Sequence, residues 1–494
     1  GTREPGGQAH RTRALMPLVL GVDSSTQSTK AELRDLESGE VVAVGAAPHP
    51  ATNPPVSEQD PEAWWQALLV AVEQLGEARS EVTAMAVAGQ QHGLVLVDHA
   101  GAAVRPAKLW NDTTSASSAA DMVAALGPDS WATRCGSVPL AAFTVSKLAW
   151  VAEHEPDSLG RTAKVMLPHD YLTWRLTGNH VTDRGDASGT GWFDPVAGDY
   201  VGELMAAAVD EADRWLAMLP RVLGPNETAG ELGSAVAGAL GLPRGVSVGP
   251  GTGDNMAAAL GLGLSPGDVA MSLGTSGTVY AVSATATHDA SGAVAGFADA
   301  AGGYLPLVCT LNATKVTDTV AAWLGTDAAG LATLALAPAA VAGATVLVPY
   351  FDGERTPNLP DATGSLLGLR TDTTREQLAL AAHDGVLCGL LGGLDALEAA
   401  GVDTGGRLHL IGGGARSAAY RQRCADLHGR EIVVPDTDET VATGAALQAA
   451  AMVSGAALSE LATRWQLGAG TTVEPQATDG AEVRARYRAA IDAS

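Results

Sequence analysis

The 494-residue chain has few of the residues that mark disulfide-linked, zinc-binding or nucleic-acid-binding proteins. It has four cysteines, Cys135, Cys309, Cys388 and Cys424, which lie far apart and form no CxxC pair. This pattern argues against a zinc site and predicts buried free thiols in a reducing, cytosolic setting. The formal net charge of −25, without a local basic patch, argues against a nucleic-acid partner.

Long hydrophobic runs are absent too, since no apolar stretch approaches the roughly 18 residues of a membrane span. Residues 1–15 lack the apolar core of a signal peptide, so we expect a disordered or artificial arm and a natural start at Met16. The sequence therefore predicts a small-molecule partner, no membrane and a cytoplasmic location. Its length and its 46% hydrophobic residues allow two or three domains with full cores.

Familiar catalytic signatures are missing or misplaced. There is no GxxxxGK[ST], no complete GxGxxG after a strand and no HExxH. One GxSxG occurs at residues 245–249, but Ser247 lies inside a Val-Ser-Val strand, whereas a nucleophile elbow needs its serine at the strand-to-helix turn. These observations disfavour a P-loop fold and a serine hydrolase.

The most informative stretch runs from a short strand at residues 245–248 through three glycines to Asp254-Asn255 and a helix-forming run. Glycine lets the backbone turn tightly and approach a ligand closely. We expect Asp254 at the N-cap of the helix, at the carboxyl end of the strand. A carboxylate there can accept a proton from a small hydroxylated substrate, and a plain N-cap is the alternative.

Two expected hairpins carry hydroxyl and glycine residues at their turns. A strand at residues 18–22 ends in Asp23-Ser-Ser-Thr-Gln-Ser-Thr-Lys30, and a strand at 269–273 ends in Gly274-Thr-Ser-Gly277. Such turns can hold phosphate oxygens, Lys30 can add a cation and Asp23 can hold a metal ion. Taken alone, the first is better explained as an ordinary polar turn that Asp23 initiates. Because the strand–turn–strand order repeats, we expect two similar halves.

Other polar turns follow predicted strands. A strand at residues 82–88 delivers Gly89-Gln-Gln-His-Gly93, and Lys108-Leu-Trp-Asn-Asp112 groups an aromatic with two polar side chains. A strand at 408–411 leads through Gly412-Gly-Gly414 into a helix, where a nucleotide can approach bare backbone. A tight structural turn explains this last stretch equally well.

Several helices can be placed from their apolar periodicity. Asp60-Pro-Glu-Ala-Trp-Trp65 opens one whose tryptophans we expect in the core, and residues 374–397 form a long apolar one. A strand at 432–434 and a helix at 440–452 are expected to complete the second half, followed by a helical tail. The Gly/Ser/Asp loop at 183–192 is expected to border the site, with no assigned role.

As a set, these motifs resemble the FGGY family of carbohydrate kinases, in order, over roughly residues 18 to 490. The resemblance is carried by the two hairpin turns, the Gly251-Thr-Gly-Asp-Asn255 stretch and the Gly412-Gly-Gly414 turn. Further motifs are similar to the branch of the family that phosphorylates D-xylulose, among them Gly89-Gln-Gln-His-Gly93, Leu109-Trp-Asn-Asp112 and Gly353-Glu-Arg-Thr-Pro357.

The resemblance implies an α/β fold of two actin-like, ribonuclease-H-like ATPase domains with an interdomain cleft. We expect residues 16–262 to be the N-terminal, sugar-binding domain and residues 263–494 to be the C-terminal, ATP-binding domain with a helical tail. The resemblance also implies ATP and Mg²⁺ as cofactors, a sugar and ATP as small-molecule partners, and a homodimer as the family's assembly.

The resemblance assigns roles to individual residues. Asp254 is the expected catalytic base, and Asp23 and Asp254 are the expected metal ligands. Six residues are expected to contact the sugar: Gln91, His92, Trp110, Asn111, Asp254 and Asn255. Six more are expected to contact ATP: Thr26, Lys30, Gly274, Thr275, Gly413 and Gly414.

The implied reaction is ATP-dependent phosphorylation of D-xylulose to D-xylulose 5-phosphate, with Asp254 as general base. An alternative keeps the chemistry and changes the sugar to another ketose or polyol, such as ribulose, gluconate or a glycerol-like molecule. A non-catalytic sugar-binding regulator on the same fold is a second alternative. It is disfavoured because Asp23 and Asp254 are both present and no added DNA-binding segment is visible.

Overall fold

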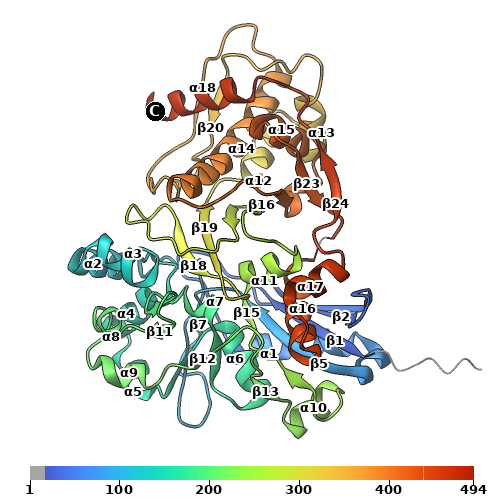
Figure 1. Cartoon of the computed structure of the whole chain (residues 1–494). Coiled ribbons are helices and arrows are strands. Elements are labelled where there is room, and N and C mark those ends of the chain that lie inside the picture. Colours follow the sequence, from blue (N-terminus) through green and yellow to red (C-terminus); the bar gives the residue numbers. More distant parts are fainter. Residues whose placement is uncertain (1–16, 438, 494) are drawn as a thin grey trace, which may run out of the picture.

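The computed structural model describes residues 17–437 and 439–493, which form two lobes stacked one above the other (Figure 1). The expectations for residues 1–15 and for Met16 lie outside the described residues. The lower lobe in Figure 1 contains the first part of the chain, and the upper lobe contains most of the part after residue 265. Each lobe is built on a seven-stranded sheet.

The first sheet has the order β13-β14-β5-β1-β2-β3, with β15 also paired to β5. The predicted hairpin is its centre, with β1 antiparallel to β2 and parallel to β5. The bounds of its strands are β1 (Leu18–Ser24), β2 (Ser28–Asp35), β3 (Val41–Pro48), β5 (Val82–Gly89), β13 (Gly230–Glu231), β14 (Ser247–Val248) and β15 (Thr252–Gly253).

The second sheet has the order β18-β19-β17-β16-β22-β23-β24. It repeats the first arrangement, because an antiparallel meander (β16, β17, β19) is followed by a parallel neighbour of its first strand (β22). This confirms the expectation of two similar halves. The bounds are β16 (Val269–Leu273), β17 (Gly277–Ala281), β18 (Ala295–Ala298), β19 (Tyr304–Thr310), β22 (Leu408–Ile411), β23 (Ile432–Pro435) and β24 (Gly470–Val473).

Strand β1 is buried on both faces because its alternating side chains enter two different cores. Leu20 packs with the fully buried Trp64 of α1 (Pro61–Glu73), which starts at the predicted N-cap, Asp60. On the opposite face, Val19 packs with alanines of α16 (Val441–Ser454). The core position predicted for the tryptophans is confirmed.

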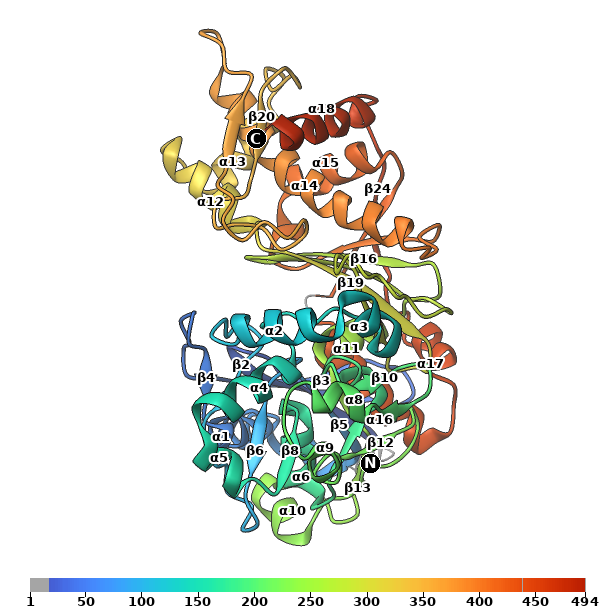
Figure 2. The same ribbon diagram turned by 90° about the vertical axis from the view of Figure 1, so that its left-hand side faces the viewer.

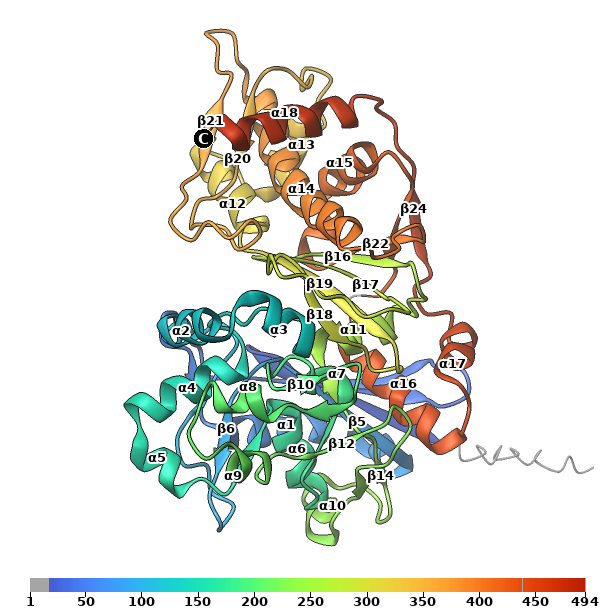
Figure 3. The ribbon, with the colours of Figure 1, turned by 60° about the vertical axis from the view of Figure 1, so that its left-hand side comes forward.

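Helix α16 corrects one expectation, since it does not complete the second half. It packs instead on β1 and β5 of the first sheet, where Figures 1 and 3 show it in red beside the blue strands. Its surface is rich in alanine and glycine, and a β-carbon at Gly21 would overlap the carbonyl oxygen of Ala442. The small residues on both sides therefore permit this close approach.

The C-terminal segment is also only partly the helical tail that the sequence predicted. Helices α17 (Leu458–Arg464) and α18 (Gly480–Ala493) are present, but β24 lies between them and pairs with β23. The proposed domain division near residue 262 falls between α11 (Asp254–Gly261) and β16. That division remains our proposal.

The lobes pack through the face of the second sheet that points toward the first lobe (Figure 2). Tyr280 and Ala270 on this face share a core with Met256 and Leu262, which lie in and just after α11. The opposite face is covered by α12 (Thr314–Trp323), α14 (Arg375–Ala399) and α15 (Ala418–His428). Helix α14 is long and apolar enough to cross a membrane, but 78% of its apolar window is buried inside the protein, as in a core helix.

The remaining elements surround these sheets. The other helices of the first lobe are α2 (Ala116–Leu126), α3 (Pro128–Cys135), α4 (Thr144–His154), α5 (Pro156–Arg161), α6 (Pro168–Thr177), α7 (Arg184–Ala187), α8 (Gly202–Ala206), α9 (Ala212–Leu216) and α10 (Ser234–Leu240). Its short strands are β4 (Glu58–Gln59), β6 (Val95–Val97), β7 (Ala107–Lys108), β8 (Lys164–Met166), β9 (Val181–Asp183), β10 (Phe193–Asp194), β11 (Asp199–Tyr200) and β12 (Arg221–Leu223). The second lobe adds α13 (Ala328–Ala335), β20 (Val346–Val348) and β21 (Ser365–Leu367).

Candidate active site

An open cavity of about 280 Å³ lies between the lobes, and we call it the cleft. The first lobe lines it with Asp23, Ser25 and the start of α11, and the second lobe lines it with β16, β17 and the glycine turn after β22. The lining residues used below are Asp23, Asp254, Asn255, Ser272, Tyr280, Gly413 and Arg421. Both predicted metal ligands therefore face one cavity.

Three strand ends meet at the floor of the cleft. In the register of the sheet, Ser24 of β1 lies beside Gly89 of β5, and Gly89 lies beside Gly253 of β15. Two of these residues border a predicted functional residue, because Asp23 precedes Ser24 and Asp254 follows Gly253, and Gln91 lies two residues after Gly89. Polar side chains at the carboxyl ends of neighbouring strands converge on a crevice, which is where α/β proteins bind ligands.

Asp254 is the first residue of α11 and not its N-cap, which is Gly253. The predicted cap position is therefore wrong by one residue. Its carboxylate does not cap the helix from outside, and Oδ1 instead accepts hydrogen bonds from the backbone N–H (2.8 Å) and side-chain Nδ2 (3.0 Å) of Asn255. The carboxylate lies at the cleft surface at the positive end of the helix.

Burial raises the pKa of Asp254 to about 6, although the backbone N–H of Asn255 stabilises the charged form. A carboxylate with this pKa is ionised at neutral pH and is a better proton acceptor than an exposed one. The arrangement therefore suits general-base chemistry.

Asp23 shares the cleft with a lysine–glutamate pair. Lys30 Nζ lies 2.6 Å from Glu439 Oε2 and 3.7 Å from Asp23 Oδ2. Burial and the charge of Glu439 raise the pKa of Asp23 to about 8, against the opposing effect of Lys30. Lys30, predicted to contact ATP, thus pairs with carboxylates here, and its role toward phosphate stays a prediction.

The donor set around Asp23 fits a hydrated divalent cation. Asp23 Oδ1 is buried and has no hydrogen-bond partner, and Asp254 lies across the same cavity. Within residues 17–437 and 439–493, no group of three or more His, Cys, Asp or Glu side chains has metal-binding geometry. Mg²⁺ commonly binds through one or two carboxylates together with water and substrate phosphates. The two aspartates match that requirement.

Gln91 and Asn255, two of the residues predicted to contact the sugar, are hydrogen-bonded to each other. Asn255 Nδ2 donates to Gln91 Oε1 at 2.7 Å. This bond orients the Gln91 amide, whose Nε2 is buried without a partner. A buried unpaired donor is costly, so it marks a position where a ligand acceptor would be stabilised.

His92 lies beside Gln91 in a strained backbone conformation, with φ of 64°. Its Nδ1 lies 2.7 Å from the carbonyl oxygen of Gly189, so Nδ1 carries the proton and Nε2 is an acceptor. Burial, together with the charge of Lys147, lowers the pKa of His92 to about 3. Its ring stacks on Phe143. A fixed neutral imidazole of this kind can accept a hydrogen bond from a sugar hydroxyl.

Trp110 and Asn111 stand on a turn held by the buried Asp112, which bonds the backbone N–H of Ser57 at 2.9 Å. Trp110 is 37% exposed and its indole N–H donates to Thr26 Oγ1 at 2.9 Å. Asn111 Oδ1 is buried without a partner. Thr26, predicted to contact ATP, thus touches a predicted sugar residue.

The predicted nucleotide residues of the second lobe are more dispersed. Gly413 is exposed and lines the cleft. Gly414 is buried, and a β-carbon there would press on Leu273 and Thr314, so its absence serves packing. Gly274 and Thr275 form the β16–β17 turn, with Thr275 exposed, and neither is among the residues around the cleft.

Sequence reasoning missed several cleft residues. Tyr280 lines the cleft although it is only 1% exposed, and its hydroxyl is buried without a hydrogen-bond partner. Arg421 also lines the cleft, and Glu439 pairs with Lys30 across 409 positions of sequence. None of these carries a local sequence signal, because each acquires its place only when distant segments pack.

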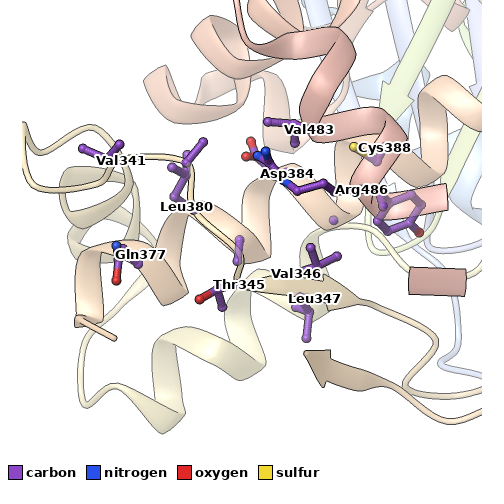
Figure 4. A pocket seen from close by; sticks show the side chains of 15 residues that line it. Val341, Thr345, Val346, Leu347, Gln377, Leu380, Asp384, Cys388, Val483 and Arg486 are labelled. Atoms are coloured by element: carbon purple, nitrogen blue, oxygen red, sulfur yellow. The ribbon is translucent and has the colours of Figure 1, made fainter. Parts of the chain in front are cut away.

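A separate, smaller cavity lies within the second lobe between α14, α18 and β20 (Figure 4). Its walls are largely apolar, with Leu347, Leu380 and Val483 among them. The one carboxylate there, Asp384, is already paired with Arg423. It lacks the convergent unpaired groups of the cleft.

Comparison of the sequence with models of protein families identifies the family to which the chain belongs. The models of the N-terminal and C-terminal domains of the FGGY family of carbohydrate kinases match residues 18–261 and 269–453. The chain belongs to the FGGY family of carbohydrate kinases. It is therefore a phosphotransferase with a two-domain α/β fold, and ATP is its expected second substrate.

Individual relatives extend this result. A xylulose kinase of Streptomyces coelicolor is 50% identical over 470 residues, which cover 94% of each chain. The crystal structure of xylulose kinase from Bifidobacterium adolescentis is 40% identical, with a TM-score of 0.84, and covers 97% of this chain and 100% of that one. A gluconate kinase from Lactobacillus acidophilus has a TM-score of 0.88 at 21% identity over 97% of each chain, which shows the shared fold alone.

Proposed function

We propose that this FGGY kinase transfers the γ-phosphoryl group of ATP to D-xylulose, which gives D-xylulose 5-phosphate and ADP. The observation that carries the proposal is the half-buried carboxylate of Asp254 in the lining of the cleft, beside the Gln91–Asn255 pair. The similarity to xylulose kinases at 50% identity supports the sugar, because it spans almost the whole of both chains.

In this mechanism, Asp254 accepts the proton of the C5 hydroxyl as that oxygen attacks the phosphorus. The bond between the hydroxyl oxygen and the phosphorus forms while the bond to the ADP oxygen breaks. Such a transfer depends mainly on positioning and on stabilising the developing charge. Asn255 holds the Asp254 carboxylate through two hydrogen bonds to Oδ1, which leaves Oδ2 to receive the proton.

The remaining predicted residues have positioning roles. Gln91, His92, Trp110 and Asn111 would hold the ketose hydroxyls. Thr26, Lys30, Gly274, Thr275, Gly413 and Gly414 would face ATP. Asp23 and Asp254 would hold Mg²⁺, which when bound neutralises phosphate charge. Tyr280 and Met256 belong to the contact between the lobes, so closure there would exclude water from the cleft.

The test is an ADP-release assay over D-xylulose, D-ribulose, gluconate and glycerol. We expect kcat/KM for D-xylulose to exceed that for the others by at least about tenfold, the effect of one well-placed hydrogen bond. Equal or better turnover of another sugar would favour the alternative specificity. Sugar binding without ADP release would favour a non-catalytic regulator.

The cellular setting is part of the same proposal. We expect a cytoplasmic enzyme, because all four cysteines are free thiols. We expect a homodimer whose partners are limited to sugar and nucleotide, without nucleic acid or membrane. Light scattering of the purified protein tests the dimer.

A further inference from the structure

A buried histidine and three carboxylates lie beneath the strand that leads to Asp254. His169 of α6 places Nε2 3.2 Å from Asp170 Oδ1, 3.4 Å from Asp186 Oδ2 and 3.5 Å from Asp183 Oδ1. No side chain of the four is more than 5% exposed. The groups come from α6, β9 and α7, so three elements close around one imidazole.

We call these four side chains the His169 cluster. Its imidazole is stabilised by the charges of the surrounding carboxylates more than by hydrogen bonds to its own nitrogens. Both nitrogens of His169 and both oxygens of Asp186 lack hydrogen-bond partners. Burial alone would lower the pKa of His169, but Asp170, Asp183 and Asp186 together raise it to about 9. The ring is therefore an imidazolium at neutral pH. The set does not have metal-binding geometry, as is true of every such group among residues 17–437 and 439–493.

Asp183 connects the His169 cluster to the catalytic strand. Its Oδ2 accepts a hydrogen bond from Thr252 Oγ1 at 2.7 Å and from the N–H of Gly185 at 2.8 Å. Its Oδ1 accepts from the N–H of Asp186 at 2.9 Å. Thr252 and Gly253 form β15, and Asp254 follows directly.

The same loop also reaches the predicted sugar residue. Gly189, three residues after Asp186, accepts the hydrogen bond from His92 Nδ1. Gly251, which directly precedes Thr252, has φ of +74°, and a β-carbon there would lie 2.8 Å from His169 Nδ1. The backbone just before β15 therefore passes close to the imidazole and to the carbonyl oxygen of Val87, and glycine is required at residue 251.

We propose that His169 and Asp183 are positioning residues for phosphoryl transfer, which hold β15 through Thr252 and so fix the carboxylate of Asp254 relative to the sugar held by His92. The proposal rests on the proposed function of Asp254. It assigns a role to the 183–192 loop, which sequence reasoning left without one. Since catalysis is sensitive to displacements of about 1 Å, a strand held less firmly would lower kcat.

The first test removes the hydrogen bond between Thr252 and Asp183 and leaves the charged side chains of the His169 cluster unchanged. Thr252→Val keeps the shape of the side chain and deletes the hydroxyl, and Thr252→Ser keeps the hydroxyl. We expect Thr252→Val to lower kcat about 30-fold, within the range that one misplaced catalytic group costs, with KM for ATP changed less than about threefold. Thr252→Ser should retain kcat within about threefold of the parent. A parental kcat in Thr252→Val, or equal losses in both variants, would overturn the proposal.

The second test uses pH. Asp170 on α6, Asp183 on β9 and Asp186 on α7 face the imidazole, and the charge of Asp254 also acts on Asp186. Because the pKa of His169 is raised, its charged form is fully present at neutral pH and is lost as pH rises through about 9. We expect an alkaline fall in kcat near pH 9 in the parent and no such fall in His169→Gln. The same alkaline limb in both proteins would overturn the proposal.

If His169→Gln fails to fold, the Thr252 pair still decides, because neither variant changes a buried charge. Failure of this inference is distinguishable from failure of the proposed function. An inactive Asp254→Asn with a fully active Thr252→Val removes the positioning role alone. A fully active Asp254→Asn removes the proposed base and, with it, this inference.

Discussion

The two lobes each bury a charged cluster, and the two clusters differ in how well they are satisfied. In the second lobe, Arg423 of α15 donates to both oxygens of Asp384 on α14, at 2.7 and 3.0 Å, and to Asp426 at 3.2 Å. Asp426 also accepts the backbone N–H groups of Gln476 and Ala477. In the first lobe, the His169 cluster has longer contacts and several atoms without partners.

This difference separates a structural network from a functional one. The Arg423 cluster ties α14, α15 and the segment before α18 together and lies away from the cleft. Three of the buried groups without hydrogen-bond partners belong to residues of the candidate active site or next to it in the first lobe, at Asp23, Gln91 and Asn111. Such groups reduce stability and are retained where a ligand supplies the missing partner. These three positions in the first lobe are therefore the ones at which the proposed function expects a ligand to supply a partner.

Among substitutions that test this difference between the lobes, Asp254→Asn in the first lobe should have the largest effect, and the effect is on kcat. Asp254→Asn should lower kcat about a thousandfold, because a general base contributes 10²–10⁴-fold. Folding should be retained, since burial already disfavours the carboxylate and the amide is neutral. Steady-state ADP release and thermal unfolding measure the two effects.

The control for Asp254 is Asp327→Asn, at an N-cap far from the cleft in α13. It should keep parental kcat. An Asp254→Asn enzyme within about fivefold of the parent would contradict the base assignment.

Arg423→Met tests the structural side of the comparison. It leaves Asp384 and Asp426 buried without their cation, so the free energy of unfolding should fall by about 3–5 kcal/mol. The kcat per folded molecule should not change. Urea denaturation followed by tryptophan fluorescence measures the loss.

Arg484→Met is the matched control, because its partner Asp395 is 38% exposed. There the loss should stay below about 1 kcal/mol. Equal losses in the two arginine variants would mean that the Arg423 cluster is no more structural than a surface pair.

Gln91→Leu tests whether the unpaired donor of the first lobe serves the sugar. Loss of a hydrogen bond costs about 0.5–1.5 kcal/mol, so KM for D-xylulose should rise about tenfold, with KM for ATP unchanged. Gln66→Leu, an exposed glutamine that bonds Glu62 on α1, is the control. An unchanged KM for the sugar in Gln91→Leu would remove this residue from the sugar site.

The smallest effect is expected at the Lys30–Glu439 pair. Lys30 is 44% exposed, so solvent screens the pair and Glu439→Gln should change the free energy of unfolding by less than about 1 kcal/mol. Urea denaturation measures it beside Arg423→Met. If Glu439→Gln lowered the free energy of unfolding as much as Arg423→Met, the Lys30–Glu439 pair in the cleft would also be important for the stability of the fold.

Local patterns predicted most of the fold. The two hairpins, the helix that begins after Asp60, and the strand–glycine–helix order at residues 408–427 all follow from periodicity and turn residues. The repeat of strand, polar turn and strand correctly indicated two similar sheets. These features depend on neighbours in sequence, so a sequence contains the information for them.

Contacts between distant segments could not be predicted in the same way. Helix α16 looks like part of the second half, but its small side chains pack on α11 and on the first sheet, which precedes it by hundreds of residues. Lys30 has a carboxylate partner that no local motif reveals. The His169 cluster joins α6, β9 and α7, and neither the sequence of α6 nor the 183–192 loop signals it alone.

The most direct test of the central claim is the pH dependence of the chemical step. Single-turnover phosphorylation of D-xylulose at saturating ATP and Mg²⁺ should be measured from about pH 5 to 8. Because Asp254 must be ionised to accept a proton, the rate should fall below pH 6 and be about tenfold under its plateau at pH 5. The residual rate of Asp254→Asn should not show this fall. A parent rate that is flat across the range would contradict the assignment of Asp254 as the base.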